Sequence, residues 1–379
     1  MRFIRFYQTI IIITLLVYAY YLYYRIIYTI NPDAIIVSIL FFGAEFHGFI
    51  ALFLYFFQMW YPLKRTTPPP PPGMTVDFYI PTYNEDIRLV RETALGCLNV
   101  NYPHNVYILD DGDRPEFKRM AEEIGCYYIR RGERSGAKAG NLNNALQLTK
   151  GEFIAVFDAD YVPQPDFLEK TLGFFEDPKV AFVQTPHQYY NIDSFTFRIK
   201  KGGKKGWHEQ DVFYRLMMPG RDYWGSTMFV GTGAIIRRKA LEDIGGFATE
   251  TLTEDFHTTL RLYSKKWKGI YQNEILATGL AAQDIKNYHI QKLRWGEGNI
   301  SLLFKKENPL LLKGLTIPQK IAFFATIFSW TIGFPKIVYF TMPSIMILFE
   351  KYPIIHFDAA FLMRYAVFLA TVILGVKIV

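Results

Sequence analysis

The sequence contains little cysteine and lacks the short motifs of several large enzyme classes. Its 379 residues include two cysteines, Cys97 and Cys126, too few for a disulfide framework or a zinc site. It has no Walker A loop, no HExxH helix and no GxSxG turn. It also has neither a helix-turn-helix pattern nor an aromatic platform for single strands, so nucleic acid is not an expected partner despite a net charge of +7.

Long apolar runs are present at both ends of the chain. Residues 3–30 and about 34–60 are each long enough to span a bilayer, which takes roughly 20 apolar residues, and 331–350 and 358–379 predict two more spans. The first run is too long for a signal peptide and lacks a small-residue cleavage site. Within the second run, Glu45 and His47 are costly in lipid, so we expect them to face protein or an aqueous cavity.

Basic residues flank the first two spans and predict the orientation of the chain. Positive charge favours the cytoplasmic side, so the region between the two pairs of spans should be a cytoplasmic domain of a multi-pass protein in the inner or plasma membrane. The basic residues are Arg2, Arg5, Lys64 and Arg65.

Composition divides the chain into four parts. Residues 1–62 hold two transmembrane helices, and 63–73 form a linker whose TTPPPPPPG stretch favours a rigid polyproline II spacer. Residues 74–313 form the cytoplasmic domain, with interfacial helices at its end. Residues 314–379 hold an interfacial helix and the C-terminal transmembrane helices.

The central domain alternates between strand and helix patterns, which predicts a parallel, Rossmann-like α/β sheet with helices on both faces. Strands are expected at 76–80 and 106–109, and a further strand-like stretch covers 228–238. Helices are expected at 166–177 and at about 252–265. In such sheets, ligands bind beyond the carboxyl ends of the strands.

Two clusters of acids follow predicted strands. Asp158 and Asp160, one residue apart, have the arrangement that lets carboxylates share a hard divalent cation with phosphate oxygens. Alternatively, one of them caps the helix predicted near Asp166. Asp110 and Asp111 have the same placement, and the alternative for them is an ordinary Asp-Gly turn.

A third cluster, Thr253-Glu254-Asp255, opens a predicted helix. Thr251 and Glu254 match a capping box, which would give both a structural role. Asp255 is then left in the first turn, where an acid is merely favourable to the helix dipole or, beside an acceptor hydroxyl, acts as a general base.

The stretch QKLRW predicts a small functional surface on a helix. Gln291 and Trp295 are four residues apart and Arg294 lies beside Gln291, so an amide, a guanidinium and an indole share one face. The alternative is an interfacial helix whose Trp and Arg anchor in lipid headgroups.

These motifs occur in an order that resembles the processive family 2 glycosyltransferases, most closely the catalytic subunit of bacterial cellulose synthase. The similarity runs from about Pro81 to Leu303 and weakens towards residue 350. The individual motifs are weak, but the ordered series between membrane spans is specific. The series is PTYNE (81–85), LDDGD (109–113), AKAGN (137–141), FDAD (157–160), QTPH (184–187), TED (253–255) and QKLRW (291–295).

The resemblance implies a GT-A fold, a nucleotide-sugar donor such as UDP-glucose, and a role for each motif. Asp255, with Glu254, would be the catalytic base, and Asp158 and Asp160 would hold Mg2+ or Mn2+. The donor would be bound by Thr82, Tyr83, Glu85, Asp110, Asp111, Lys138, Asp158 and Arg294. The acceptor would be bound by Trp295, Gln291, His187, Gly231 and Thr232.

The implied product is a β-linked polysaccharide, cellulose or a related β-glucan, whose growing chain is exported through the membrane. The family usually has a Phe-Phe-Cys-Gly segment near the acceptor, and here Val230 replaces the cysteine, which leaves the acceptor sugar open. Four predicted spans are fewer than the family's channel uses, and no cyclic di-GMP domain follows. The chain is then a compact relative, a truncated one, or one that exports with an accessory subunit or as a homo-oligomer.

Other functions fit the same motifs. One group is the synthases of chitin-like, hyaluronan-like or mannan polymers, although the hyaluronan type usually has Gly-Asp-Asp-Arg where this chain has Thr-Glu-Asp. Another is a non-processive transferase to a lipid acceptor. A different class is a catalytically inactive membrane scaffold, which the retention of every expected acid disfavours.

Overall fold

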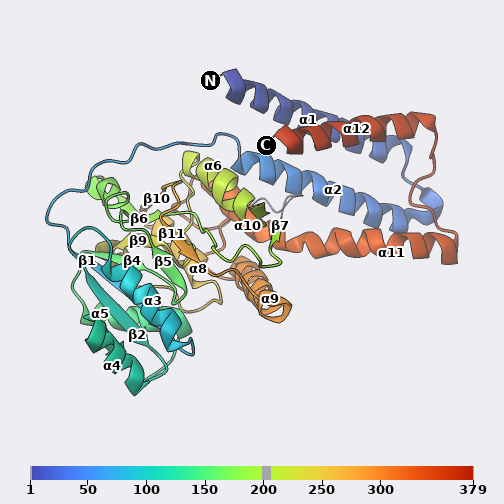
Figure 1. The fold of residues 1–379 in the computed structure, drawn as a ribbon. Helices are drawn as coiled ribbons and strands as arrows, with labels where there is room; N and C mark the ends of the chain where they lie inside the picture. The colour runs from blue at the N-terminus through green and yellow to red at the C-terminus, as the bar shows by residue number, and fades with distance from the viewer. Residues whose placement is uncertain (1, 199–205, 379) are drawn as a thin grey trace. The chain divides into compact units, whose positions relative to one another are not determined.

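The computed structural model describes residues 2–198 and 206–378. They divide into two compact units. The first joins the two ends of the chain, up to Tyr61 and from Phe324 onwards, and the second runs from Pro62 to Phe323. Figure 1 shows both units.

The first unit is built of apolar helices. Helix α1 (Arg2–Tyr28) lies beside α12 (Ala359–Ile378), and α2 (Ile35–Gln58) lies beside α11 (Gly333–Phe349), as Figure 1 shows. Among the described residues, four helical stretches are long and apolar enough to cross a membrane. They are Ile4–Tyr28, Pro32–Gln58, Ile317–Phe349 and Ala359–Lys377, in agreement with the four predicted spans except that the third begins earlier.

Glu45 and His47, inside this helical unit, each have a polar partner, as expected for polar side chains surrounded by apolar helices. The guanidinium of Arg25, which is fully buried, donates to Glu45 at 2.8 Å, and the hydroxyl of Tyr21 donates to the same carboxylate at 2.6 Å. A ring nitrogen of His47 lies 2.7 Å from the hydroxyl of Thr331. Glu45 and His47 therefore both face protein, as the sequence predicts.

In the described part of the second unit, seven strands form one mixed sheet in the order β10-β6-β9-β4-β1-β2-β3. β9 pairs antiparallel with β4 and β6, and the other neighbours pair parallel. The strands are β1 (Val76–Thr82), β2 (Asn105–Asp110), β3 (Tyr127–Arg130), β4 (Phe153–Val156), β6 (Val180–Gln184), β9 (Ala234–Arg237) and β10 (Lys268–Tyr271).

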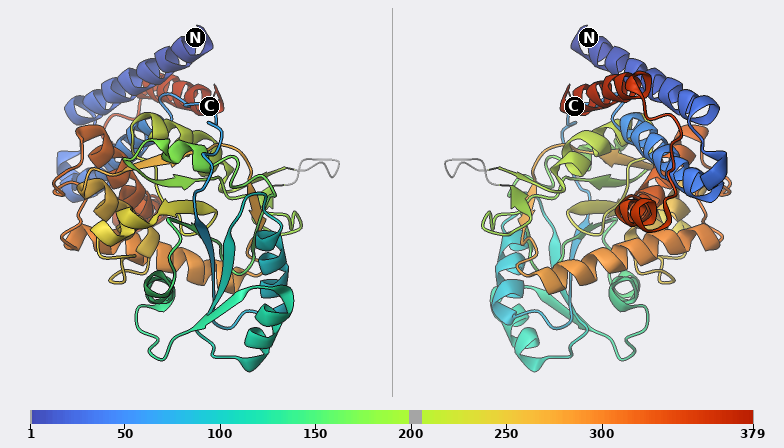
Figure 2. Two further views of the ribbon diagram at one scale, coloured as in Figure 1. Left: turned by 90° about the vertical axis from the view of Figure 1, so that its left-hand side faces the viewer. Right: turned by 90° about the vertical axis from the view of Figure 1, so that its right-hand side faces the viewer.

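Helices cover both faces of the parallel part of this sheet. Figure 2 shows α3 (Ile87–Leu98) and α4 (Pro115–Ile124) on one face and α5 (Ala137–Leu148) on the other. The side chains between these layers are apolar and fully buried, and burying one as large as Phe78 contributes about 1.5–3 kcal/mol. The layered α/β arrangement agrees with the prediction.

Shorter elements complete the second unit. They are β5 (Tyr161–Pro163) paired with β11 (Ala277–Gly279), β7 (Phe197–Arg198) paired with β8 (Trp207–His208), and the helices α6 (Met218–Tyr223), α7 (Arg238–Asp243), α8 (Glu254–Ser264), α9 (Ile285–Ser301) and α10 (Ile317–Phe328), whose last residues belong to the first unit.

Three local predictions were wrong. The sheet is mixed because β9 runs antiparallel to its neighbours. Residues 166–177 form turns and a short 3-10 helix, Leu172–Glu176, instead of an α-helix. The strand predicted at 228–238 begins only at Ala234, because Gly231 and Gly233 have φ of +88° and +61°, which extended chain does not allow.

The proline-rich segment, predicted to be a rigid polyproline II spacer, lies along the surface of the second unit. Arg65 forms an ion pair with Asp222, the Gln272 amide donates to Thr67, and Tyr102 donates its hydroxyl to the carbonyl of Pro71 at 2.8 Å. A Cβ at Gly173 would lie 2.1 Å from the Pro68 oxygen, so the segment packs directly on the short 3-10 helix. This contact gives a physical reason for the missing helix at 166–177.

Candidate active site

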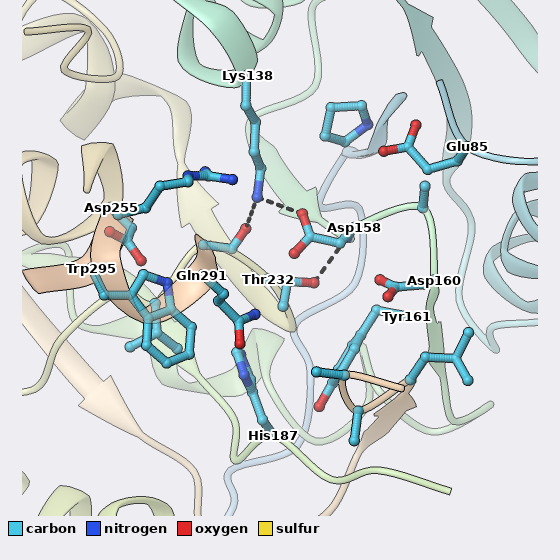
Figure 3. A pocket seen from close by; sticks show the side chains of 18 of the residues that line it. Glu85, Lys138, Asp158, Asp160, Tyr161, His187, Thr232, Asp255, Gln291 and Trp295 are labelled. Carbon is cyan, nitrogen blue, oxygen red and sulfur yellow. Dashed lines mark hydrogen bonds and ion pairs between the residues drawn. The ribbon is translucent and has the colours of Figure 1, made fainter. Parts of the chain in front are cut away.

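A cavity of about 660 Å³ opens beyond the carboxyl ends of β1, β2 and β4. Its volume is within the range of about 300–1,000 Å³ that is typical of small-molecule sites. Figure 3 shows Glu85 and Asp160 on one side, Asp255 and Trp295 on the other, and Lys138 with Asp158 between them. The predicted site residues that line it are Thr82, Tyr83, Glu85, Asp111, Lys138, Asp158, Asp160, His187, Gly231, Thr232, Glu254, Asp255, Gln291, Arg294 and Trp295.

The loop after β1 is held by its own hydrogen bonds. One carboxylate oxygen of Glu85 accepts from the Thr82 hydroxyl at 2.7 Å and from the Tyr83 backbone N–H at 2.7 Å. Arg114 adds bonds to the Thr82 hydroxyl and to the Glu85 carbonyl, at 3.0 and 2.9 Å. The loop is therefore ordered before any ligand arrives, with the exposed Tyr83 ring available for contact.

The two acids that follow β2 have different surroundings. The Asp110 carboxylate is fully buried and accepts from the Gly112 and Arg114 N–H groups and from the Tyr128 hydroxyl, at 2.8, 2.7 and 3.0 Å. Asp110 does not line the cavity, so the structure gives it a role in shaping the turn instead of the predicted contact with the donor. Asp111 lines the cavity and forms two bonds with Arg131, at 2.7 and 2.8 Å.

Lys138, in the first turn of α5, lies at the centre of the cavity. Its ammonium donates to Asp158 at 2.5 Å and to the Gly231 carbonyl at 2.8 Å (Figure 3). Burial alone lowers the pKa of Lys138, but the carboxylates of Asp158 and Glu254 raise it above its ordinary value. The site therefore holds a fixed positive charge beside its acids.

Asp158 and Asp160 fit a divalent cation that shares its coordination with a ligand. Burial and the charge of Asp158 raise the pKa of Asp160 to about 7, so the ionised pair lacks sufficient positive charge nearby. Among the described residues, no group of three or more His, Cys, Asp or Glu side chains is arranged to hold a metal. An open site of two carboxylates suits a hard cation that keeps water or phosphate oxygens as its other ligands.

Asp255 lies in the first turn of α8, and one of its oxygens accepts from the Phe256 N–H at 2.7 Å. Burial and the charge of Glu254 raise the pKa of Asp255 to about 7, a value suited to a general base near neutral pH. The predicted capping box is absent. Thr253 is the N-cap, and the Thr251 hydroxyl donates to the Thr253 carbonyl instead of capping the helix.

Helix α9 brings the three side chains of QKLRW to the cavity, as predicted. Trp295 is partly buried, and the ammonium of Lys292 lies 4.6 Å from the centre of its ring. Gln291 and Arg294 are exposed to solvent. Glu209 fixes this end of the helix, because it accepts from the Tyr288 hydroxyl and the Lys292 ammonium, each at 2.8 Å.

The remaining predicted residues come from the β6 and β9 ends of the cavity. His187 accepts from or donates to the Tyr214 hydroxyl at 2.8 Å, and burial lowers the pKa of His187 to about 4, so its ring is neutral. The Thr232 hydroxyl accepts from the Asp158 N–H at 2.9 Å, and Gln184 donates to the Thr232 carbonyl at 2.8 Å. Thr232 therefore orients Asp158 as well as lining the wall.

Arg131 and Tyr161 are among the lining or supporting residues that the sequence prediction missed. Arg131 pairs with Asp111, and the basic end of the CYYIRR strand opposite LDDGD was a usable signal. Tyr161 directly follows Asp160, lines the cavity, and accepts from the Gln188 N–H at 2.8 Å. No pattern in the sequence singles out Tyr161, because a tyrosine after a strand is equally common in a core.

Comparison with known proteins agrees with this geometry. Residues 77–245 match the family described as glycosyl transferase family 2, and residues 242–379 match the family described as cellulose synthase. The chain therefore carries a family 2 glycosyltransferase domain over residues 77–245. The cellulose synthase match includes α8, α9 and the C-terminal helices.

Curated relatives of this glycosyltransferase are bacterial cellulose synthases. The UDP-forming cellulose synthase 1 catalytic subunit of Komagataeibacter xylinus is 38% identical over 352 residues, which cover 90% of this chain and 47% of that protein. Cellulose synthase 2 of Novacetimonas hansenii is 39% identical over 343 residues, covering 87% of this chain and 21% of that protein. The chain spans about half the length of the first and about a fifth of the second.

A solved structure has the same fold. It is a mannosyltransferase from Pyrobaculum calidifontis in complex with GDP-Man and Mn2+, with a TM-score of 0.63 and 17% identity. The match covers 90% of this chain and 99% of that one. The predicted GT-A architecture with flanking apolar helices is therefore confirmed.

Proposed function

We propose that this chain is the catalytic part of a membrane-bound, inverting glycosyltransferase that extends a β-linked glucan from UDP-glucose. The observation that carries the proposal is a single cavity in which Asp255, Lys138, the Asp158–Asp160 pair and Trp295 converge. The relative's description as UDP-forming supports UDP as the leaving nucleotide. The growing polysaccharide is the acceptor.

The donor binds at the strand ends. Tyr83 and the ordered loop after β1 contact the nucleoside, with the paired Asp111 nearby. Lys138 and Arg294 contact the diphosphate, for which a guanidinium offers a fork of donors. Asp158 and Asp160 hold a divalent cation, Mg2+ or Mn2+, whose charge offsets that of the diphosphate.

The transfer is one displacement. The acceptor hydroxyl gives its proton to a carboxylate oxygen of Asp255 while its oxygen bonds to the anomeric carbon of the donor. The bond from that carbon to the diphosphate breaks, and the electron pair leaves with the diphosphate. An α-linked donor thus gives a β-linked product, and the Trp295 ring supports the acceptor sugar on its C–H face.

The membrane setting follows from the apolar helices and the basic residues beside them. The protein is a multi-pass protein of the cell membrane, and the glycosyltransferase domain lies on its cytoplasmic side. The polymer leaves the site at the acceptor end, where α9 contributes Gln291 and Trp295.

The test is turnover by the full chain in lipid vesicles, with Mg2+ or Mn2+ and a panel of UDP- and GDP-sugars. Nucleotide release and polymer formation are both measured, and the polymer is digested with linkage-specific glycanases. Asp255→Asn is the matched control, because it keeps the shape and removes the base. We expect release from UDP-glucose alone, a glucanase-sensitive polymer, and a loss of about 10²–10⁴-fold in the variant.

Other outcomes contradict the proposal in distinct ways. Release without polymer indicates transfer to a lipid acceptor. A polymer formed from another donor identifies a different synthase. No release with any donor, or equal release by Asp255→Asn, indicates the scaffold function or a different base.

A further inference from the structure

Helix α8, which carries Glu254 and Asp255, is held along its length by the chain that follows Trp295. We call residues 298–314 the brace. It contacts α8 or its N-cap at three places, near the start, the middle and the end of the helix. Neither Gly298 nor Glu307, the two main contact residues, lines the cavity.

The first contact is between two backbones. A Cβ at Gly298 would lie 2.8 Å from the Thr253 nitrogen and 2.7 Å from its hydroxyl oxygen, closer than any side chain allows. Thr253 is the N-cap of α8, two residues before Asp255. Gly298 follows Arg294 by four residues and Trp295 by three on α9, so it lies on their side of the helix. This contact therefore fixes the spacing between the two catalytic elements.

The second contact is a cluster of charged groups. One carboxylate oxygen of Glu307 lies 3.2 Å from a ring nitrogen of His257, and the other lies 3.2 Å from the Nε atom of Arg261. Arg261 also donates to Glu250 at 2.7 Å. His257 is only 1% exposed and lies in the same first turn of α8 as Asp255, so Glu307 holds the turn that carries the base.

The third contact holds the far end of α8. Gly314 has φ of +95°, and a Cβ there would lie 2.4 Å from the Ser264 carbonyl oxygen. The Lys266 ammonium donates to the Gly314 carbonyl at 2.7 Å. With both ends and the middle held, α8 cannot rotate or slide without breaking contacts with the brace.

We propose that the brace sets the position of the Asp255 carboxylate relative to Arg294 and Trp295, with Glu307 and Gly298 as positioning residues. This inference rests on the proposed function. The base on α8 and the diphosphate and acceptor contacts on α9 belong to different elements, and the cavity between them is open. The brace therefore determines whether the acceptor hydroxyl lies within reach of the base when the donor is bound.

The test compares Glu307→Gln with Glu297→Gln in the full chain in lipid vesicles. Glu297 is an exposed carboxylate on α9, so the control removes the same charge away from the brace. Measured are kcat, the donor KM and the number of UDP-binding sites per chain. We expect Glu307→Gln to lower kcat per UDP site by about 10- to 100-fold, the scale for a misplaced catalytic group, with the donor KM nearly unchanged. Glu297→Gln should match the wild type.

A merely structural role for Glu307 would reduce the number of UDP sites and leave kcat per site unchanged, and that result overturns the inference. If Glu307→Gln binds no UDP, the same measurements are made on Gly298→Ala, and kcat per UDP site again decides between the two roles. The added methyl displaces α9 from Thr253 without removing a charge. If the wild type is active and the variants are unaffected, the result rejects the positioning role of the brace but not the proposed function. A wild type that is inactive with every donor rejects the proposed function and this inference together.

Discussion

The two ends of the cavity differ in how their side chains are held. At the strand ends, Glu85 is bonded to its own loop, Asp111 to Arg131, and Asp158 to Lys138. On α9, the structure over residues 2–198 and 206–378 shows no hydrogen bond or ion pair to the side chains of Gln291 and Arg294. The first end is arranged before a ligand binds, and the second keeps exposed groups free for one.

This difference matches what each end would bind. A nucleotide sugar is the same molecule in every cycle, so fixed groups bind it with little loss of side-chain entropy. A growing polymer must move by one unit after each addition, so its contacts must form and release. Gln291 on the exposed face of α9 can do so without disturbing the sheet, and Arg294 beside it can release the departing diphosphate in the same way.

The largest predicted effect is at the α9 end. Replacing Arg294 by Ala removes a charged donor from the departing diphosphate, and we expect kcat to fall by about 10²–10³-fold. Nucleotide affinity should change much less, because the strand-end contacts remain. Single-turnover kinetics with UDP-glucose and UDP titration of the same sample separate the two. An equal loss of kcat and of UDP affinity would mean that nucleotide binding is not confined to the strand-end side of the cavity.

A smaller effect is expected at the strand-end side. Arg131→Met leaves the carboxylate of Asp111 buried without its partner, which costs about 1–3 kcal/mol. We expect a lower Tm and weaker UDP binding, with kcat at saturating donor preserved. Thermal unfolding with and without UDP measures both. Arg130→Met is the control, because Arg130 pairs with Asp113 on the exposed surface.

The smallest predicted effect is the change in kcat/KM for each unit of pH. Since burial raises the pKa of Asp255 to about 7, its ionised, basic form is lost as pH falls through that value, and kcat/KM should fall about tenfold per unit below it. Because the pKa of Asp160 is also raised, its protonation would add a second step to the loss of activity at low pH. A bound cation would keep the Asp160 carboxylate ionised and remove that step. We therefore expect a slope of one at saturating Mg2+ and a steeper slope at low Mg2+. A profile that is flat from pH 5 to 8 would exclude Asp255 as the base.

Much of the fold could be predicted because local pattern and tertiary environment agree. β1, β2 and β4 are largely apolar runs with an acid at the end or within three residues after it, and they are mostly buried strands whose ends meet at the cavity. The prediction of a helix at 166–177 was wrong because it rested on a local sequence pattern. The packing of Gly173 against Pro68 joins two segments that are far apart in the sequence. A short stretch of sequence does not reveal where a distant proline-rich segment will pack.

The site residues also divide into those that a local pattern predicts and those that depend on contacts between distant segments. The predicted residues that follow strands line the cavity, because strand direction alone brings them to one edge, and their roles stay predictions. Asp110 was assigned to the donor along with its neighbour, yet an odd and an even residue at a strand end point in opposite directions. The partner of Asp111, Arg131, comes from the next strand, and such pairing depends on register.

The antiparallel strand β9 has a consequence for how this site can change. The other strands deliver their residues to the cavity as they end, whereas the loop at Gly231 and Thr232 reaches the same edge just before β9 begins. The donor-side loops and this loop thus enter from opposite chain directions, and they are joined by the bonds from Lys138 to the Gly231 carbonyl and from the Asp158 N–H to the Thr232 hydroxyl. Under the proposed function, a change of backbone at Gly231 or Thr232 would therefore also move donor-side groups, so variation in the sugar to be extended would be confined to side chains such as that of Val230.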